Sequence, residues 1–324
     1  MSHNILITGC LGFIGFHTAL RLIKDTKSEV FGVDNINNYY DVELKKSRHK
    51  ILKKYKNFNF RKIDIRSKSR FKDFLKKSNI KYVIHLAAMA GVRNSIDDPK
   101  SYLDNNIIGF FNILEVCKEL KIKHLLYAST SSVYGDSKKF PSSENDNTDY
   151  PVSFYAATKK SNEIMAYSYS NIFKLPSTGL RFFTVYGPYG RPDMALFKFT
   201  KLISESKKIP LFNKGDHVRD FTYIDDIVEG IVLLIKKPPR KKIPFEIYNL
   251  GSGNPKSLKF FLKNIEKNLN KKAALNLKAM QVGDVHKTHA DIKKINKAYS
   301  YQPKFDIPTG VKNFVNWYKK YFKE

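Results

Sequence analysis

Near its start this chain carries the stretch Asn4-Ile5-Leu6-Ile7-Thr8-Gly9-Cys10-Leu11-Gly12-Phe13-Ile14-Gly15. A short apolar run is followed by a glycine turn and then by a helical pattern. Gly9 suits the tight turn, Gly12 lets the backbone approach a pyrophosphate, and Gly15 lets the helix pack closely on the strand. The free amides at the helix start then face the phosphates, with the positive end of the helix dipole behind them. The stretch therefore predicts a dinucleotide-binding unit of strand, turn and helix.

An acidic residue, Asp34, ends the next apolar run, Phe31-Gly32-Val33-Asp34. A carboxylate at this position accepts hydrogen bonds from ribose hydroxyls and repels a 2′-phosphate, which favours NAD over NADP. The alternative is that Asp34 caps a turn or a helix. Asp64 and Ile65 end the third run, where we expect the adenine edge of the cofactor.

Apolar, β-rich runs alternate with helical patterns as far as Tyr186. The expected strands are Ile5–Thr8, Val30–Asp34, Phe58–Ile65, Tyr82–Ala88, Leu125–Ser129 and Thr178–Val185. This alternation predicts an α/β fold, a Rossmann-type doubly wound parallel sheet with helices on both faces. Beyond Tyr186 the loops become rich in glycine and proline. We therefore expect an NAD-binding domain over residues 1–186 with a returning segment at 222–251, and a smaller α/β substrate-binding lobe over residues 187–221 and 252–324.

Composition bounds the class of protein. The 324 residues are 42% hydrophobic, enough to bury a sizeable core. The start lacks the pattern of a signal peptide, and no run approaches the ~20 apolar residues of a membrane span, so we expect no membrane partner. Two cysteines, Cys10 and Cys117, are too few for a disulfide scaffold and indicate a reducing cytoplasm.

The formal net charge of +28 raises the alternative of a nucleic-acid-binding protein. The lysines are spread over nearly every predicted helix and do not form one stripe. That spread is typical of a compositional bias, so we expect no nucleic-acid partner. A basic surface would also attract an anionic small substrate.

The stretch Tyr155-Ala156-Ala157-Thr158-Lys159 is the candidate catalytic unit. In a helix the positions i and i+4 lie on one face, where an ammonium favours the phenolate over the phenol. A tyrosine titrates near ~10, so it serves as a base only where a fixed cation lowers its pKa. The alternative is an ordinary amphipathic helix with the tyrosine in the core and the lysine in water.

Four motifs together resemble the extended short-chain dehydrogenase/reductase family of nucleotide-sugar enzymes. They are Gly9-x-x-Gly12-x-x-Gly15, His85-Leu86-Ala87-Ala88, Ser129-Thr130-Ser131-Ser132-Val133-Tyr134-Gly135 and Tyr155-x-x-x-Lys159. Within this family the chain is similar to the bacterial UDP-glucuronate 4-epimerases, over Asp34–Val42, Ala88–Ser95, Arg181–Pro188, Gly190–Phe199, Arg219–Asp226 and Gly310–Tyr318. The likeness covers essentially the whole chain. It departs at Cys10-Leu11, where small residues are more usual, and at a short basic loop near Pro238-Pro239.

The resemblance implies an NAD-dependent 4-epimerase that converts UDP-glucuronate to UDP-galacturonate. Tyr155, made acidic by Lys159 and by the positive nicotinamide ring, would take the proton of the sugar's 4-hydroxyl while the C4 hydride moves to NAD. Return of the hydride and proton to the other face of the 4-keto sugar would give the epimer. Thr130 and Ser131 would hydrogen-bond the reacting oxygen and relay the proton, the alternative being that they cap the end of a strand.

The resemblance also implies which residues hold the cofactor. They are Gly9, Gly12, Phe13, Ile14, Gly15, Asp34, Asn35, Asp64, Ile65, Leu86, Ala87, Ala88, Asn105, Tyr155, Lys159 and Phe182.

A second group is expected to bind the UDP-sugar, namely Met89, Arg93, Ser131, Ser132, Thr184, Arg191, Lys198, Phe212, Arg219 and Asp284. Arg219 would hold the diphosphate, or else form a surface ion pair, and Phe212 would contact uracil. Thr184 and Arg191 would hold the C6 carboxylate out of alignment with the C4 carbonyl and so suppress loss of carbon dioxide. Relatives that dehydrate or decarboxylate carry a carboxyl group just before Val-Tyr-Gly, so Ser131 and Ser132 imply that the chemistry stops at epimerisation.

Three other interpretations remain open. They are a 4-epimerase of UDP-glucose or a UDP-N-acetylhexosamine, a UDP-glucuronate decarboxylase of the same fold, and a nucleic-acid-binding protein. The helices predicted near Tyr102–Leu120 and Phe154–Phe173 have apolar faces on both sides, which predicts a homodimer through a four-helix interface like that of relatives.

Overall fold

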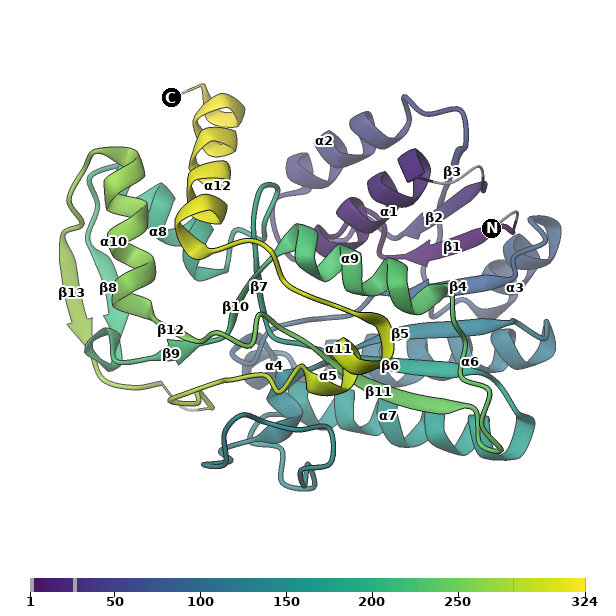
Figure 1. The fold of residues 1–324 in the computed structure, drawn as a ribbon. Helices are drawn as coiled ribbons and strands as arrows, with labels where there is room; N and C mark the ends of the chain where they lie inside the picture. The colour runs from purple at the N-terminus through teal and green to yellow at the C-terminus, as the bar shows by residue number, and fades with distance from the viewer. Residues whose placement is uncertain (1–2, 26–27, 282, 324) are drawn as a thin grey trace.

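The computed structural model describes residues 3–25, 28–281 and 283–323, and its centre is a seven-stranded sheet (Figure 1). The strand order is β11-β6-β5-β4-β1-β2-β3, and every neighbouring pair is parallel. The strands are β1 (Ile5–Thr8), β2 (Val30–Asp34), β3 (Phe58–Lys62), β4 (Tyr82–His85), β5 (His124–Thr130), β6 (Ser177–Phe182) and β11 (Phe245–Leu250). The order reverses between β1 and β4, which is where such sheets bind ligands beyond the carboxyl ends of their strands. The predicted doubly wound parallel sheet is confirmed.

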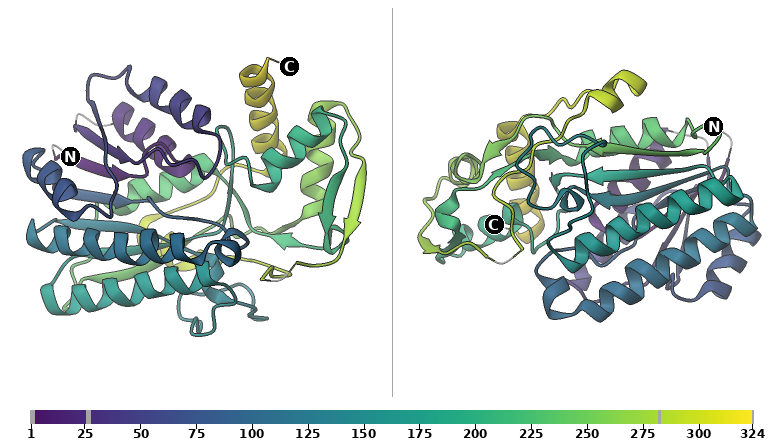
Figure 2. Two further views of the ribbon diagram at one scale, coloured as in Figure 1. Left: turned by 180° about the vertical axis from the view of Figure 1, so that it is seen from behind. Right: turned by 90° about the horizontal axis from the view of Figure 1, so that it is seen from below.

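Helices cover both faces of this sheet (Figures 1 and 2). One face carries α1 (Phe13–Asp25), α2 (Val42–Leu52) and α9 (Ile224–Ile235), and the other carries α3 (Lys68–Lys77), α6 (Gly109–Glu119) and α7 (Phe154–Phe173). In β1, Ile5 and Ile7 join the apolar cluster that contains Phe16 of α1, whereas Leu6 joins the cluster that contains Phe110 of α6. Because successive side chains of a strand point to opposite faces, a strand that is apolar throughout needs helices on both.

Short helical segments fill the connections on the α6 side. They are α4 (Asn94–Asp97), α5 (Pro99–Tyr102) and the π-helix η1 (Leu103–Ile108), which runs directly into α6. A 3-10 turn, η2 (Ser131–Tyr134), follows β5. The predicted helix over Tyr102–Leu120 is therefore a π-helical segment followed by an α-helix.

A smaller part of the molecule stands beyond the carboxyl ends of the strands (Figure 1). Its elements are α8 (Ala195–Ser204), β8 (Ile209–Phe212), η3 (Asn213–Gly215), β9 (Val218–Arg219), β12 (Lys256–Ser257), α10 (Leu258–Leu269), β13 (Leu275–Lys278) and α12 (Ile307–Phe322). β8 pairs with β13, and β9 pairs with β12. Phe261 of α10 and Phe314 of α12 are fully buried in its core, while α11 (Lys293–Tyr299) packs near β11.

Three expected strands end earlier than predicted, and the first of them, the run Tyr82–Ala88, is a strand only as far as His85. The run Phe58–Ile65 leaves the sheet after Lys62, so Asp64 and Ile65 follow the strand. The run Thr178–Val185 divides into β6 and β7 (Thr184–Tyr186), and β7 pairs with β10 (Phe221–Tyr223) outside the main sheet. The change of partner occurs at Phe183, whose N–H donates to the carbonyl of Leu250 (3.0 Å) while the next N–H donates to Asp220 (3.1 Å). An apolar run gives no sign of such a change, since β6 and most of β7 are buried.

Three further features concern the edge of the sheet, the cysteines and the character of the helices. Phe245–Leu250 joins the edge of the sheet, and Lys236 to Lys242 form a connection with exposed lysines. Cys10 and Cys117 are free and buried. Within the described ranges, no helix has both the length and the apolar character that a membrane crossing requires.

Candidate active site

A cavity of about 1010 Å³ opens at the carboxyl edge of the sheet. It reaches from the glycine turn after β1, past the ends of β2, β4 and β5, to β8 and β9 of the smaller part. The sheet and the smaller part therefore both contribute to its walls, and residues far apart in the sequence meet around it.

All but one of the predicted site residues line this cavity. From the cofactor group these are Gly9, Gly12, Phe13, Ile14, Gly15, Asp34, Asn35, Ile65, Leu86, Ala87, Ala88, Asn105, Tyr155, Lys159 and Phe182. From the remaining groups they are Met89, Arg93, Thr130, Ser131, Ser132, Thr184, Arg191, Lys198, Phe212, Arg219 and Asp284.

Asp64 is the exception, because it lies at a separate shallow pocket beside Ser67 and Asp104. Arg66 forms an ion pair with it (2.7 Å) and holds the pKa of Asp64 at about 2. Asp64 also accepts a hydrogen bond from Nδ2 of Asn35 (3.2 Å), which does line the cavity. Asp64 therefore contacts the cavity lining through Asn35, and its expected place at the adenine edge of the cofactor stays a prediction.

The glycine turn leaves no room for side chains. Gly9 has φ of +68°, and a Cβ there would lie 2.8 Å from the backbone nitrogen of Ala87. A Cβ on Gly15 would collide with the carbonyl oxygen of Gly9, so α1 packs on the turn through bare backbone. The N–H of Gly12 donates to that same carbonyl (2.9 Å), and α1 begins at Phe13. The amides at the start of α1 thus form one wall of the cavity, which suits a pyrophosphate.

Asp34 stands at the end of β2 with two backbone donors and one cation. Its Oδ2 accepts from the N–H of Leu11 (3.2 Å) and its Oδ1 from the N–H of Ile36 (2.8 Å). The ammonium of Lys45 lies 3.8 Å from Oδ1 and is itself buried, which lowers the pKa of Lys45 against the opposing effect of Asp34. A fixed carboxylate beside a backbone cradle fits the ribose and pyrophosphate of NAD.

Tyr155 and Lys159 lie one turn apart near the start of α7, which is capped by Ser153. Burial raises the pKa of Tyr155, while a hydrogen bond with the Thr130 hydroxyl and the charge of Arg191 act in the lowering direction. Among the protein's own groups the net effect is therefore opposite to the lowered pKa that the sequence led us to expect. The groups that oppose burial come from β5 and from the loop after β7, not from the neighbouring lysine.

Lys159 is only 2% exposed, and burial lowers its pKa to about 8 against the opposing charge of Glu163. Glu163 lies one further turn along α7 and is held by Arg181 of β6 through Nε (2.9 Å) and Nη2 (2.8 Å). Ser129 also donates to Glu163 (2.6 Å). Sequence reasoning missed this buried ion pair next to Tyr155 and Lys159. Its only signal was a glutamate four residues after the lysine.

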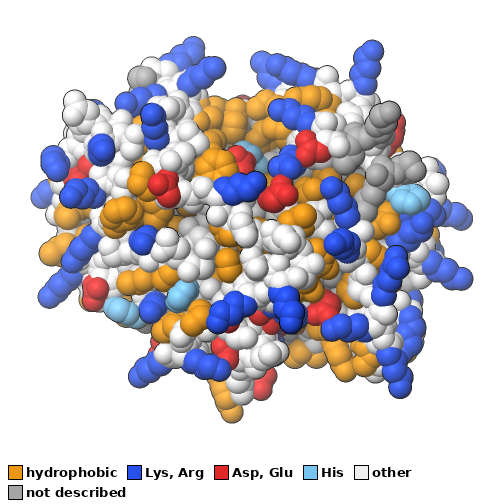
Figure 3. Space-filling view, in the orientation of Figure 1, with side chains coloured by type: hydrophobic (Ala, Val, Ile, Leu, Met, Phe, Trp, Pro, Cys, Tyr) orange, Lys and Arg blue, Asp and Glu red, His pale blue; other side chains and the backbone are white. Residues whose placement is uncertain are grey.

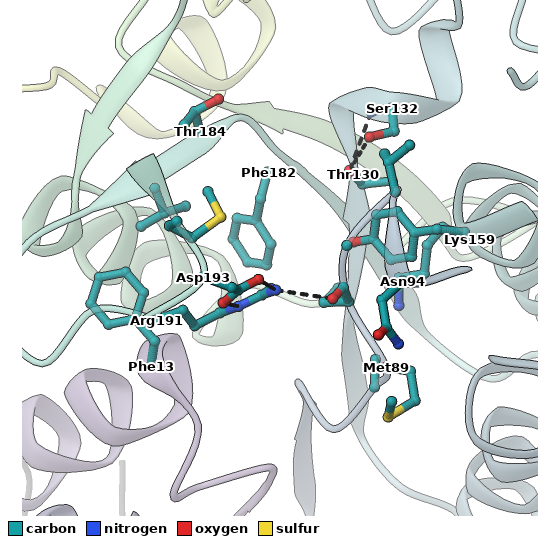
Figure 4. A pocket seen from close by; sticks show the side chains of 18 of the residues that line it. Phe13, Met89, Asn94, Thr130, Ser132, Lys159, Phe182, Thr184, Arg191 and Asp193 are labelled. Carbon is teal, nitrogen blue, oxygen red and sulfur yellow. Dashed lines mark hydrogen bonds and ion pairs between the residues drawn. The ribbon is translucent and has the colours of Figure 1, made fainter. Parts of the chain in front are cut away.

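The hydroxyl of Thr130, which forms a hydrogen bond with Tyr155, lies at the end of β5. Thr130 caps η2, since its Oγ1 accepts from the N–H of Ser132 (3.2 Å), and it also contacts the Ser132 hydroxyl (3.2 Å; Figure 4). Thr130 therefore both caps η2 and lines the cavity, and its expected contact with the reacting oxygen stays a prediction.

Arg191 lies in the loop between β7 and α8 and crosses the cavity towards β4. Its Nη2 donates to the carbonyl of Ala90 (2.9 Å), and its Nε and Nη2 pair with Asp193 (Figure 4). Burial works against its charge, but Asp193, Tyr39 and Tyr155 more than offset this, so the pKa of Arg191 is raised. Thr184 lies apart from Arg191 in Figure 4, with Phe182 between them in that view.

The far end of the cavity is basic and aromatic. Arg93 stacks over the ring of Phe212 (4.9 Å to the centroid) and pairs with Asp284 (3.1 Å). Arg219 lies 4.0 Å from the same carboxylate and donates to the carbonyls of Val285 (2.6 Å) and His286 (2.9 Å). Burial lowers the pKa of Arg219. This arrangement of fixed cations beside a flat ring suits a diphosphate joined to a base.

Several cavity residues were missed from the sequence, namely Asn37, Tyr39, Tyr40, Lys45, Asp193 and His217. Tyr39 and Tyr40 lie in a motif that was noted only as a resemblance. Lys45 lies in the run Lys45-Lys46-Ser47-Arg48, which is typical of a solvated helix face, yet Lys45 and Arg48 are both buried.

Comparisons with known proteins agree with this geometry. A protein-family model described as the NAD dependent epimerase/dehydratase family matches residues 5–251. Protein CapI of Staphylococcus aureus is 47% identical over 335 residues, which cover 99% of this chain and 100% of CapI. A probable UDP-glucuronate 4-epimerase of Rhizobium meliloti is 43% identical over 333 residues, which cover 98% and 97% of the two chains.

A solved structure resembles the whole fold. The crystal structure of UDP-glucuronic acid 4-epimerase from Bacillus cereus, in complex with UDP-glucuronic acid and NAD, matches with a TM-score of 0.92 and 34% identity. The match covers 98% of this chain and 99% of that one. With its glycine turn, its tyrosine and lysine pair and these relatives, this chain belongs to the NAD dependent epimerase/dehydratase family.

Proposed function

We propose that this protein is an NAD-dependent UDP-glucuronate 4-epimerase, which forms UDP-galacturonate through a transient 4-keto sugar. One observation carries the proposal. A single cavity joins the glycine turn and Asp34 to Tyr155 with Thr130, and then to Arg191 and Arg219. A dinucleotide, a sugar hydroxyl, a carboxylate and a diphosphate each find a matching group along it.

Each residue has a proposed role in the reaction. Tyr155 takes the proton of the 4-hydroxyl and later returns it, and Thr130 holds the reacting oxygen and the phenol in one hydrogen-bonded chain. Lys159 places a positive charge on α7, one turn from Tyr155, in the wall of the cavity that would hold NAD. NAD, when bound, supplies the hydride chemistry by accepting the C4 hydrogen and giving it back.

The residues before Val133 support epimerisation over further chemistry. Ser131 and Ser132 line the cavity where dehydration or decarboxylation would need a carboxyl group. Their hydroxyls hydrogen-bond a sugar but provide no acid of suitable pKa. We therefore propose that the sugar leaves with its carboxylate intact.

The test uses purified protein supplied with NAD and UDP-glucuronate, with products separated by chromatography and carbon dioxide collected. We expect UDP-galacturonate without release of carbon dioxide. A UDP-pentose with carbon dioxide would instead indicate a decarboxylase. Turnover of UDP-glucose or UDP-N-acetylglucosamine, with none of UDP-glucuronate, would indicate an epimerase of neutral sugars. A salt-sensitive gel shift by protein without bound NAD would support nucleic-acid binding, although Figure 3 shows lysine and arginine spread over the visible face without one stripe.

A cytoplasmic homodimer and a division into two domains belong to the same proposal. Exposed apolar side chains gather on α6 and α7, which pack against each other, and include Phe111 (46% exposed), Ile164 (59%) and Tyr167 (46%). Two copies that meet through these helices would form a four-helix interface. We propose residues 1–186 with 222–251 as the NAD-binding domain, and residues 187–221 with 252–324 as the domain that binds the nucleotide sugar. Light scattering on the purified protein tests the dimer, and Ile164→Asp should then give monomers.

A further inference from the structure

Asp193 occupies the edge of Arg191 on which a carboxylate would bind. Nε of Arg191 donates to Oδ1 (3.0 Å) and Nη2 donates to Oδ2 (2.5 Å). Two parallel bonds of this kind are how an arginine recognises a carboxylate with a defined direction. Asp193 therefore presents to Arg191 the same chemical group that the C6 position of a uronate would present.

The second edge of the guanidinium is also engaged. Nη2 donates its other hydrogen to the carbonyl of Ala90 (2.9 Å), which also accepts from the hydroxyl of Tyr39 (2.7 Å). A paired contact along Nη1 and Nη2 would need that hydrogen. Among the contacts of the described residues, Nη1 is therefore the nitrogen left for a ligand carboxylate.

This matters because the proposed reaction needs the sugar to turn. Hydride leaves one face of C4 and returns to the other, so the 4-keto sugar must present both faces at the same place. A carboxylate held by two parallel bonds would be fixed in direction. Such a grip stabilises the bound sugar but not the transition state, and it therefore slows turnover.

We propose that Asp193 is a positioning residue that sets how the site recognises a uronate. By filling one edge of Arg191, it limits that arginine to a contact through Nη1, which detects the carboxylate without fixing its direction. This inference rests on the proposed function and adds a residue that sequence reasoning did not assign. Asp193 is placed to act in this way, because it lines the cavity and 41% of its side chain is exposed.

The test compares binding and turnover in NAD-loaded protein. Asp193→Ala frees the Nε edge, so the affinity for UDP-glucuronate measured by calorimetry should rise about tenfold, as expected for one further charge-assisted hydrogen bond. The affinity for UDP, which has no carboxylate, should stay the same. In steady-state assays both KM and kcat for UDP-glucuronate should fall, with kcat about tenfold lower.

A second variant of Asp193 and a control variant of Glu43 accompany this test. Asp193→Asn keeps the size of the side chain but offers one donor in place of an acceptor, so it should change the same quantities in the same direction by less. Glu43→Gln removes a carboxylate from an exposed ion pair with Lys46 on α2 and should change none of them.

Two outcomes would overturn the proposal. Equal changes in the affinities for UDP and UDP-glucuronate would mean that Asp193 only supports its loop. An unchanged or reduced affinity for UDP-glucuronate in both variants would mean that Asp193 does not restrain Arg191. If the unaltered protein bound UDP-glucuronate but did not epimerise it, the proposed function would fail, whereas the two affinities would still test Asp193.

Discussion

The two ends of the cavity are built from different material. The cofactor end is backbone, with Gly9 and Gly15 in contacts too close for any side chain. The substrate end consists of long side chains from loops and a short strand, in which Arg93, Arg191 and Arg219 are each paired with or close to an aspartate. A backbone wall tolerates almost no change in shape, whereas ion pairs can exchange partners. The comparison teaches that, in the proposed function, shape would hold the cofactor and charge would select the sugar.

The largest effect is expected at Tyr155, where the two ends meet. Tyr155→Phe removes the oxygen that takes the proton but keeps the ring that packs edge-on against Tyr102 (6.1 Å between centroids). We expect kcat to fall about 10²–10⁴-fold, while NAD stays bound because the backbone wall is untouched. Initial rates of UDP-galacturonate formation and the absorbance of bound cofactor measure the two effects. Epimerisation at the unaltered rate would contradict the assignment of Tyr155.

The next effect concerns the backbone wall itself. Gly15→Ala places a methyl group against the carbonyl of Gly9, so α1 must move away from the turn. We expect a loss of about 1–3 kcal/mol in the free energy of unfolding, together with loss of bound NAD. Denaturant titration and cofactor absorbance measure both. Gly12→Ala is the matched control, because its Cβ meets one atom, at 3.0 Å, and should disturb the fold less. Equal stability of Gly15→Ala and the unaltered protein would contradict a wall defined by shape.

A smaller effect is expected at Arg219, on the side-chain end. Arg219→Ala removes a fixed cation, so KM for UDP-glucuronate should rise about tenfold or more. Bound NAD should be unchanged, since the glycine turn does not contact Arg219. Arg219→Lys keeps the charge but loses the planar fork of the guanidinium. Its KM for UDP-glucuronate should therefore lie between those of the unaltered protein and of Arg219→Ala. If Arg219→Ala lost NAD as readily as substrate, the two ends would not be independent.

The smallest effect is a displacement of the pH profile by Arg191→Gln. The charge of Arg191 lowers the pKa of Tyr155, so its removal raises that pKa. With Tyr155 as the proposed base, the rising limb of kcat against pH should move to higher pH, and turnover at neutral pH should fall severalfold. Glu43→Gln again provides the control. A profile that stayed in place, or moved to lower pH, would separate Arg191 from the chemistry of Tyr155.

Much of the cofactor end could be predicted from the sequence because its signals are local. The glycines, Asp34 and the pair of Tyr155 and Lys159 each lie within one short stretch whose spacing has a geometric meaning. The parallel sheet with helices on both faces followed from the alternation of apolar runs and helical patterns. The substrate residues came from resemblance alone, and all of them do line the cavity.

The remainder depends on contacts between distant residues. The pair of Glu163 and Arg181, and the burial of Lys45 beside Asp34, appear in the sequence only as ordinary charged residues. The raised pKa of Tyr155 depends on the depth of its burial, which spacing does not reveal. The ion pair between Arg191 and Asp193 joins neighbours in sequence. Which nitrogen of Arg191 is left for a ligand also depends on the carbonyl of Ala90, which lies on another loop.

The two buried cysteines have a practical consequence. Cys10 and Cys117 are both 0% exposed, and burial raises the pKa of each thiol, so both stay protonated and out of reach of alkylating reagents. With only these two cysteines in the chain, Ile164→Cys on the exposed side of α7 would add a single reactive thiol. A fluorophore or spin label attached there would respond to a neighbouring copy, while every native core residue stays in place.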